Sequence, residues 1–277
     1  MLLLATLPLA GIAQASDTGP KARVHGGEGK AERPRIALVL SGGGAKGAAH
    51  IGVLKVLEEK RIPVDIVVGT SMGSYVAGMY AMGLSAEEVE RMTLAIDWNK
   101  GYQDKVGRDE LSLRKKQQSE KYQLRTDIGV NGDQTQLPDG FFQGQSMASL
   151  LRHATSNLPA QKSFDDLPIP YRAVATDMET VTPFVLDSGS LAKAMQASMS
   201  IPGALKPVEW EGHILADGGT VNNMPVDVAK AMGADVVIAV DIGAKLRTRE
   251  SLKSGLAMID QLTTYMTQVG TEKQKAL

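Results

Sequence analysis

The fold is decided by the stretch Val64-Asp65-Ile66-Val67-Val68, which runs directly into Gly69-Thr70-Ser71-Met72-Gly73. A short apolar run that ends at a glycine predicts a buried strand, and the small and apolar residues that follow predict a helix. The junction reads G-x-S-x-G, in which the flanking glycines let the backbone make a sharp strand-to-helix turn. Such a turn presents the serine hydroxyl at its tip. Ser71 is therefore a candidate nucleophile, with Gly69 and Gly73 as the elbow glycines.

Apolar runs and helical segments alternate on both sides of this junction. Three further runs predict strands at residues 36–40, 171–175 and 236–240. Helices are expected at residues 48–60, 85–95, 146–156, 191–198, 225–232 and 252–269, the second of them opened by a capping box of Ser85 and Glu88. This alternation predicts an α/β fold, a three-layer α/β/α sandwich with a mostly parallel central sheet. Residues 98–145 follow neither pattern, and we interpret them as a candidate lid.

A glycine-rich loop, Gly42-Gly43-Gly44-Ala45-Lys46-Gly47, lies between the first predicted strand and the first predicted helix. Its backbone N–H groups, together with a helix N-terminus, can form an anion site. In acyl transfer the anion is the oxyanion of the tetrahedral intermediate, and one such donor typically contributes ~3–4 kcal/mol. The same glycines also fit G-x-G-x-x-G, with Asp65 about 20 residues further on, as in a dinucleotide site. Both interpretations stay open at this point.

A third pattern, Asp217-Gly218-Gly219, follows the short apolar stretch of residues 213–216. A serine nucleophile needs a base to accept its proton, and an aspartate within hydrogen-bond reach can serve in place of histidine. The two glycines would let another backbone approach closely. The alternative is a type I turn after a strand, where Asp-Gly is common. Taken together with the other two patterns, we interpret Asp217 as the base.

Composition narrows the possible functions. A net charge of -1 and an aromatic content of 4% argue against a nucleic-acid-binding surface. The chain contains no cysteine, which excludes a disulfide, a thiolate nucleophile and a cysteine metal site. Its four histidines lack the paired spacing of metal ligands. We therefore expect neither a metal site nor a nucleic-acid partner.

The polar residues near these patterns have simpler explanations to set beside catalysis. His50 is expected to pack within the first helix, and His153 to be solvated on a polar one. His213 lies about 13 Å from Asp217 along an extended strand, too far to pair with it through local geometry. Asp177 is interpreted either as a wall of the site or as a helix cap, and Lys46 as a functional part of the glycine loop or an exposed side chain.

The amino terminus has the character of an export signal. Residues 2–12 are apolar and Ala13-Gln14-Ala15 fits a small-residue cleavage site, although no Lys or Arg precedes the apolar run. The sequence predicts a signal peptide at residues 1–15, a flexible linker at residues 16–33 and a catalytic domain at residues 34–277. The protein is then exported, to the periplasm, the outer membrane or the extracellular space.

The three patterns, in this order, resemble the patatin-like phospholipase family, and the resemblance covers about residues 34–243. Further similarity lies in residues 49–54, 197–203 and 222–225. The sequence most resembles the bacterial, exported members, in which the lipase domain can belong to an outer-membrane autotransporter. The resemblance implies a Ser-Asp dyad without a catalytic histidine, metal or cofactor: Ser71 attacks an acyl carbonyl, Asp217 activates Ser71, and the amides of Gly43 to Ala45 hold the oxyanion.

The resemblance thus implies a lipid acyl hydrolase of the phospholipase A or lysophospholipase type that works through an acyl-enzyme. We expect a phospholipid or related lipid ester as substrate, a membrane surface as partner, and a pocket lined near Met72, Met199 and Leu205. The basic residues between Arg114 and Arg125 are interpreted as a solvated face, with lipid head groups as the alternative ligand.

Two alternative functions are a general carboxylesterase or thioesterase with a Ser-His-Asp triad, and a non-catalytic lipid- or dinucleotide-binding module. The sequence shows no interface, so the oligomeric state is unknown.

Overall fold

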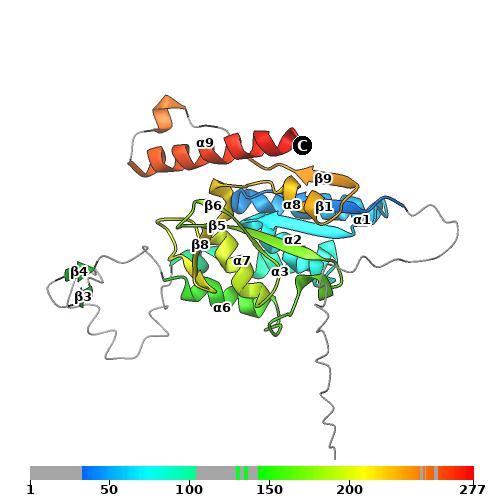
Figure 1. Cartoon of the computed structure of the whole chain (residues 1–277), viewed down its shortest axis with the longest axis horizontal. Helices are drawn as coiled ribbons and strands as arrows, with labels where there is room; N and C mark the ends of the chain where they lie inside the picture. Colours follow the sequence, from blue (N-terminus) through cyan, green and yellow to red (C-terminus); the bar gives the residue numbers. More distant parts are fainter. Residues whose placement is uncertain are drawn as a thin grey trace, which may run out of the picture. The chain divides into compact units, whose positions relative to one another are not determined.

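A central β-sheet organises the described part of the chain (Figure 1). The computed structural model describes residues 33–103, 129–131, 134–136, 143–243, 246, 248–252 and 255–277. The predicted signal peptide, nearly all of the predicted linker, most of the candidate lid and the basic residues between Arg114 and Arg125 lie outside the described residues. The strands of the sheet are β1 (Ile36–Leu40), β2 (Ile66–Thr70), β5 (Tyr171–Asp177), β6 (Thr182–Leu186), β7 (Val208–Trp210), β8 (His213–Asp217) and β9 (Val236–Val240).

The sheet has a parallel half and an antiparallel half. Its strand order is β7-β8-β5-β2-β1-β9, with β6 also paired to β5. The pairs β5·β2, β2·β1 and β1·β9 are parallel, whereas β5·β6, β5·β8 and β8·β7 are antiparallel. The predicted fold class is confirmed, but the antiparallel half was not expected. Strand β7 has only three residues and three of the five residues of β6 are exposed, so neither shows the continuous buried run of β1 and β2.

Helices cover both faces of this sheet because side chains alternate along each strand. On β1, Leu38 and Leu40 face one core cluster, and Ala37 and Val39 face the other. The first cluster is completed by α1 (Ala48–Glu59), α2 (Met72–Ala81), α3 (Ala86–Ala95), α6 (Gln145–Ala154) and α7 (Leu191–Met199). The second is covered by α8 (Val226–Ala231), and α9 (Gly255–Lys275) is drawn beyond α8 in Figure 1.

Shorter elements complete the described chain: α4 (Trp98–Gln103), the separate hairpin of β3 (Gly129–Asn131) and β4 (Gln134–Gln136), and the 3₁₀ turns η1 (Gly44–Gly47), η3 (Phe164–Asp166), η4 (Gly218–Thr220) and η5 (Arg249–Ser251). The capping box predicted at the start of α3 is confirmed: Ser85 Oγ accepts from Glu88 N, and Glu88 Oε2 accepts from Ser85 N. Such a cap typically stabilises a helix by ~1 kcal/mol.

Strands β2 and β8 meet end to end on one edge of β5. Strand β6 occupies one edge of β5 over Ala173–Asp177, so β2 and β8 must both lie along the other edge. The last residue of β2, Thr70, lies opposite Val174, and the last residue of β8, Asp217, lies opposite the next residue, Ala175. Strands β2 and β8 run in opposite directions and end at neighbouring residues of β5. The residues that follow these two strands can therefore come into contact.

Candidate active site

Ser71 sits on a strained turn between β2 and α2. Its φ of 53° and ψ of -128° place a non-glycine residue in a sparsely populated region, at a typical cost of ~1–3 kcal/mol. The turn is tightly packed: a Cβ on Gly69 would lie 2.4 Å from Gly73 O, and a Cβ on Gly73 would lie 2.2 Å from Leu40 O. Only glycine fits at these two positions, which explains in physical terms why the G-x-S-x-G pattern is present.

Hydrogen bonds around Ser71 hold this strained conformation. Ser71 N donates to Ser198 Oγ at 2.8 Å, and Ser198 Oγ donates in turn to Val174 O at 2.6 Å. On the other side, Ser71 O accepts from Ser74 Oγ at 2.7 Å. Ser198, buried on α7, thus ties the turn to β5 at the residue opposite the end of β2. Sequence reasoning placed Ser198 in a family-like stretch but did not identify this role.

The structure brings Asp217 to Ser71. Ser71 Oγ donates to Asp217 Oδ2 at 2.6 Å, and Asp217 Oδ1 accepts from Gly219 N at 2.7 Å. Both side chains are almost fully buried, with 7% of each residue exposed. Gly218 is required here because a Cβ on it would lie 2.2 Å from Val174 O. Gly218 therefore permits the close backbone approach that the pattern suggested, whereas a Cβ on Gly219 would meet the side chains of Asp217 and Asn223 at 3.0 and 3.2 Å.

Burial controls the protonation of Asp217. Loss of solvent raises the pKa of its carboxyl to about 6, against the opposing effects of the hydrogen bonds from Ser71 and Gly219. At neutral pH the carboxylate is ionised but is a stronger base than an exposed aspartate. The pKa of the Tyr102 hydroxyl, on α4, is raised to about 12 by burial and by the nearby charge of Asp217. The ionised Asp217 carboxylate is therefore available to accept the proton of the Ser71 hydroxyl.

The glycine loop lies directly against Ser71. A Cβ on Gly42 would approach Ser71 Cβ to 3.0 Å. Gly42 N already donates to Asn223 O, and Lys46 N donates to Gly43 O. In the described part of the chain no acceptor pairs with the amides of Gly43, Gly44 and Ala45, so these three can receive an anion. The side chain of Lys46 is exposed, and Gly47 packs against Met72.

The structure does not assemble the dinucleotide site that the same glycines suggested. Asp65 precedes β2 and its Oδ2 accepts from Ile36 N at 2.8 Å, at the start of β1. The glycine loop follows the other end of β1, so the strand length separates the loop from Asp65. In a dinucleotide fold the phosphate loop and the acidic residue must face one ligand at the carboxyl ends of the strands.

Two histidines, His50 and His213, have partners other than Ser71, and His153 is exposed on α6 as expected. His50 is buried, and its Nε2 lies 2.8 Å from Ser41 O, an acceptor that requires the proton on Nε2. Burial lowers the pKa of His50. His213 does not pair with Asp217, as expected, but its Nδ1 lies 2.8 Å from Asp177 Oδ2 on the facing strand. Asp177 caps no described helix: its Oδ1 accepts from Glu179 N in the turn after β5, and its Oδ2 pairs with His213.

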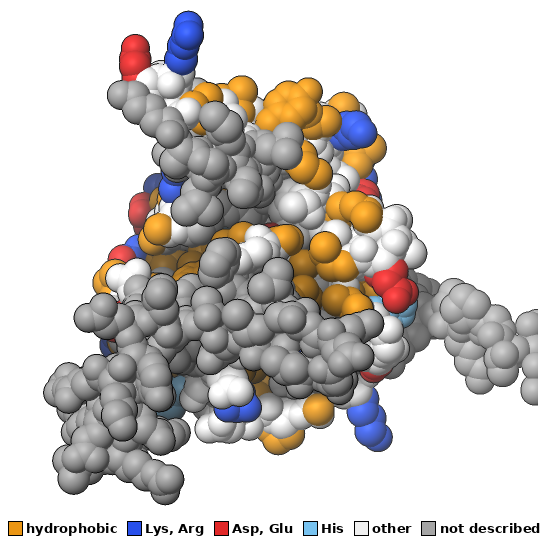
Figure 2. Space-filling model, turned by 90° about the vertical axis from the view of Figure 1, so that its left-hand side faces the viewer, with side chains coloured by type: hydrophobic (Ala, Val, Ile, Leu, Met, Phe, Trp, Pro, Cys, Tyr) orange, Lys and Arg blue, Asp and Glu red, His pale blue; other side chains and the backbone are white. Residues whose placement is uncertain are grey.

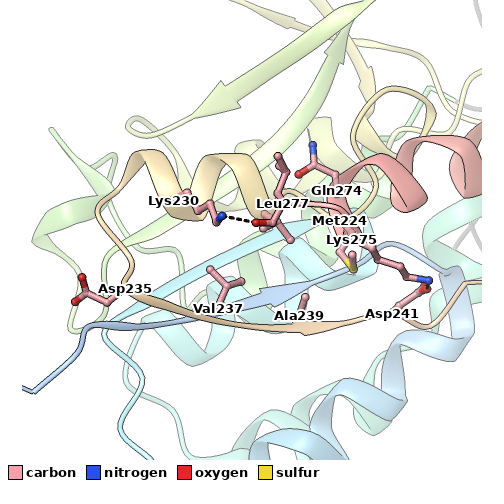
Figure 3. Close-up of a pocket in the computed structure, with 10 residues that line it drawn as sticks. Met224, Lys230, Asp235, Val237, Ala239, Asp241, Gln274, Lys275 and Leu277 are labelled. Carbon is pink, nitrogen blue, oxygen red and sulfur yellow. Dashed lines mark hydrogen bonds and ion pairs between the residues drawn. The ribbon is translucent and has the colours of Figure 1, made fainter.

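The residues predicted to line an acyl pocket are buried. Met199 and Leu205 are fully buried in the first core cluster, so they pack the core, and Met72 is also nearly buried. A cavity of about 370 Å³ does occur between α8, β9 and the end of α9 (Figure 3), but neither Ser71 nor Asp217 lines it. Among the residues described, no three His, Asp or Glu side chains converge in a way that could hold a metal ion.

Comparison with known proteins gives a consistent result. The family model described as Patatin-like phospholipase matches residues 38–230. Patatin-like phospholipase domain-containing protein 6 of Homo sapiens is 37% identical over 215 residues, which cover 77% of this chain and 14% of that protein. Lysophospholipase NTE1 of Mycosarcoma maydis is 34% identical over 209 residues, covering 76% of this chain and 10% of that protein. The chain thus spans less than one sixth of the length of these relatives.

Among solved structures, one match is to the crystal structure of VipD from Legionella pneumophila. Its TM-score to this chain is 0.47 and its sequence identity is 17%, with 86% of this chain and 55% of that chain covered.

Proposed function

This chain belongs to the patatin-like phospholipase family, and from that premise we propose that it is a lipid acyl hydrolase of the phospholipase A or lysophospholipase type. The observation that carries the proposal is the 2.6 Å hydrogen bond from Ser71 Oγ to Asp217 Oδ2 on a strained strand-to-helix turn. Relatives named as phospholipases and a lysophospholipase support a lipid ester as the substrate. The reaction uses a Ser-Asp dyad and requires no metal ion.

The proposed reaction proceeds in two steps. Asp217 Oδ2 accepts the proton of Ser71 Oγ as that oxygen bonds to the acyl carbonyl carbon. The tetrahedral intermediate collapses, the ester C–O bond breaks, and the departing alcohol takes the proton from Asp217. Water then enters, gives its proton to Asp217 and attacks the acyl-enzyme, which releases the fatty acid and returns the proton to Ser71.

The glycine loop is the proposed oxyanion hole. The amides of Gly43, Gly44 and Ala45 are the available donors, and they lie beside Gly42, which touches Ser71. They stabilise the negative charge that develops on the carbonyl oxygen in the transition state. Lys46, whose side chain is exposed, contributes to the electrostatic potential at the loop and makes no direct contact with the oxyanion.

A lipid surface is the proposed source of substrate. Apolar side chains gather around a hollow on the face shown in Figure 2. Exposed apolar residues on the antiparallel half of the sheet are Met178, Val181, Val185 and Ile214. Such residues favour contact with an apolar phase. None of the helices in the described part of the chain is both long and apolar enough to cross a membrane.

We also propose that the protein is exported, on the pattern of residues 1–15 alone. The expected product begins at Ser16. Mass spectrometry of the amino terminus of the protein, expressed with its own leader in a bacterial host, tests this. Recovery of an intact Met1 in the cytosolic fraction would contradict it.

The test of function is fatty-acid release from mixed phospholipid and lysophospholipid vesicles in the presence of EDTA. Wild type is expected to release fatty acid, and Ser71→Ala and Asp217→Asn to lose the activity. A serine-directed fluorophosphonate should label wild type at Ser71 and leave Ser71→Ala unlabelled. Binding without turnover or labelling would sink the proposal and favour a lipid-binding module.

A general carboxylesterase is the alternative to separate. The same preparation should be assayed with a water-soluble short-chain ester and with vesicles, and in His50→Ala, His153→Ala and His213→Ala variants. The dyad predicts that turnover persists in these variants, with reduced stability in His50→Ala. Hydrolysis of the soluble ester alone, together with its loss in one histidine variant, would favour a triad esterase.

A further inference from the structure

Helix α9 contacts the loop that carries Asp217. Thr267 Oγ1 donates to Gly219 O at 3.1 Å. Gly219 is the residue whose N–H donates to Asp217 Oδ1 at 2.7 Å. The hydroxyl of Thr267 is therefore connected through Gly219 to the carboxylate of Asp217. Sequence reasoning identified only an amphipathic helix in this region, and nothing in that pattern marks Thr267.

Contacts from other elements add to the hydrogen bonds that the loop after Asp217 makes within itself, such as Asn222 N to Gly218 O at 2.9 Å. Gly218 and Gly219 have no side chains with which to fix η4, and glycine has the largest backbone freedom of any residue. The turn is held at its start by Thr176 Oγ1, which donates to Asp217 O at 2.7 Å. It is held at Gly219 by Thr267. Both contacts act on the backbone and leave the Asp217 carboxylate free to accept a proton.

Resting on the function proposed above, we propose that Thr267 is a positioning residue for Asp217. Its hydroxyl fixes Gly219, so that the Gly219 N–H points at Asp217 Oδ1. This hydrogen bond in turn orients Oδ2 toward Ser71 Oγ. Thr267 makes no contact with Ser71 or the reacting atoms. Its effect is on the geometry and basicity of the carboxylate, because a hydrogen bond donated to the ionised form lowers the carboxyl pKa.

The rest of α9 fixes the helix in the register that this contact needs. Gln274 Oε1 accepts from Asp227 N at 3.0 Å, and Lys275 Nζ lies 2.8 Å from Asp241 Oδ2. Figure 3 shows these side chains where the end of α9 meets α8 and β9, with Lys230 bonded to Leu277 O. Residues 267, 271, 274 and 275 share one helix face by their spacing.

A second threonine on this face provides an internal comparison. Asn223 Nδ2 lies 3.5 Å from Thr271 Oγ1 and 3.4 Å from Gly42 O, on the glycine-loop side of the site. These are long contacts, near the limit for a hydrogen bond. Thr271 is therefore expected to affect the glycine loop weakly and to leave the protonation of Asp217 unchanged.

The experiment compares Thr267→Val, which removes only the hydroxyl, with Thr267→Ser, which restores it. Thr267→Val is expected to lower kcat about tenfold with KM unchanged, because a misplaced catalytic group slows the chemical step. The acidic limb of its kcat/KM profile should move up by ~0.5 pH unit, since the carboxylate loses part of its donated hydrogen bond. Thr267→Ser should regain most of the activity and the wild-type limb.

Two controls make the result specific. Thr271→Val should lower kcat less than Thr267→Val and leave the acidic limb in place. Thr180→Val removes an exposed hydroxyl on the β5–β6 turn, where its partner is Thr182, and should change neither quantity. A Thr267→Val enzyme with wild-type kcat and pH profile, or a Thr267→Ser enzyme as impaired as the valine variant, would overturn the proposal.

A readout that needs no activity separates this proposal from the proposed function. Hydrogen–deuterium exchange of the peptide that contains Gly218, Gly219 and Thr220 should be faster in Thr267→Val than in wild type or Thr267→Ser. If wild type hydrolyses no lipid ester, the proposed function has failed, and faster exchange still supports the positioning contact. Equal exchange in all three proteins would overturn the contact itself.

Discussion

Two aspartates on neighbouring strands, Asp217 and Asp177, have nearly the same local arrangement. Each ends a strand, each accepts a hydrogen bond from the backbone N–H two residues further on, and each is paired with one side chain at 2.6–2.8 Å. Their pKa values nevertheless shift in opposite directions. Burial raises that of Asp217 to about 6, whereas the bond from Glu179 N, with help from His213, lowers that of Asp177.

The surroundings account for this difference. Asp217 ends β8 at the point where β2 also ends, beneath α7 and beside Ser71, and its partner is an uncharged hydroxyl. Asp177 is itself only 5% exposed, but its carboxylate accepts a hydrogen bond from Glu179 N and pairs with His213, which has 43% of its side chain exposed. Burial outweighs the hydrogen bonds at Asp217 and makes its carboxylate a better base, whereas at Asp177 the hydrogen bonds that favour the ionised form dominate and lower the carboxyl pKa.

The largest expected effect comes from making the same substitution at both positions. Asp217→Asn should lower kcat/KM by about 10³-fold or more, because the amide cannot accept the serine proton. Asp177→Asn should stay within about twofold of wild type, since its carboxylate pairs with Glu179 N and His213 and not with Ser71. Vesicle hydrolysis assays measure both. Comparable losses of kcat/KM in the two variants would contradict the assignment of Asp217 as the base and Asp177 as a structural residue.

The residue that follows each aspartate gives the next test. Gly218→Ala places a Cβ 2.2 Å from Val174 O, which should lower the free energy of unfolding by about 2–3 kcal/mol. Met178 is 40% exposed, and Met178→Ala should change stability by about 0.5 kcal/mol or less. Urea denaturation of the two variants measures this. A Gly218→Ala protein as stable as wild type would show that the turn can move away from β5.

The pH dependence of activity sharpens the comparison further. Because the pKa of Asp217 is raised to about 6, its base form is present above that pH and is lost as the pH falls through it. The kcat/KM should therefore be constant above pH 6 and fall about tenfold for each pH unit below it. A profile measured with a substrate that does not itself titrate tests this. An acidic limb near pH 4 would mean that burial does not control this carboxyl.

The smallest effect concerns stability at Asp177. Its pKa is lowered in the folded state, so its contribution to stability is present above its unfolded pKa and is lost as the pH falls through the folded value. Asp177→Asn should therefore lower the urea midpoint slightly at pH 7, and the difference from wild type should shrink below about pH 4. A difference that stays constant from pH 7 to pH 3 would show that ionisation of Asp177 is not involved.

Much of the parallel half was predictable, and little of the antiparallel half was. The strand at residues 236–240 and the cap at Ser85 agree with the structure because each depends on residues close together in the chain. Strands β6 and β7 carry no comparable signal, since β7 has only three residues and three of the five residues of β6 are exposed. They become strands through pairing with β5 and β8.

The candidate site divides in the same way. The glycines at 69 and 73 were recognisable because a tight turn leaves no room for a Cβ, a requirement visible in the residue types themselves. The supporting roles of Ser198 and Thr267 were not recognisable, since a hydroxyl on a helix can face any neighbour. The partner of His213 was likewise hidden, because it depends on the register of β5 against β8.

The sequence by itself determined the local conformations: a strained serine turn, a glycine loop and an Asp-Gly-Gly turn, each set by steric needs of adjacent residues. Only the tertiary structure decided that these segments share one site. Ser71 and Asp217 lie 146 residues apart, and they meet because β2 and β8 end at neighbouring residues of β5. Strand order and register arise from packing over the whole sheet, and no short segment contains that information.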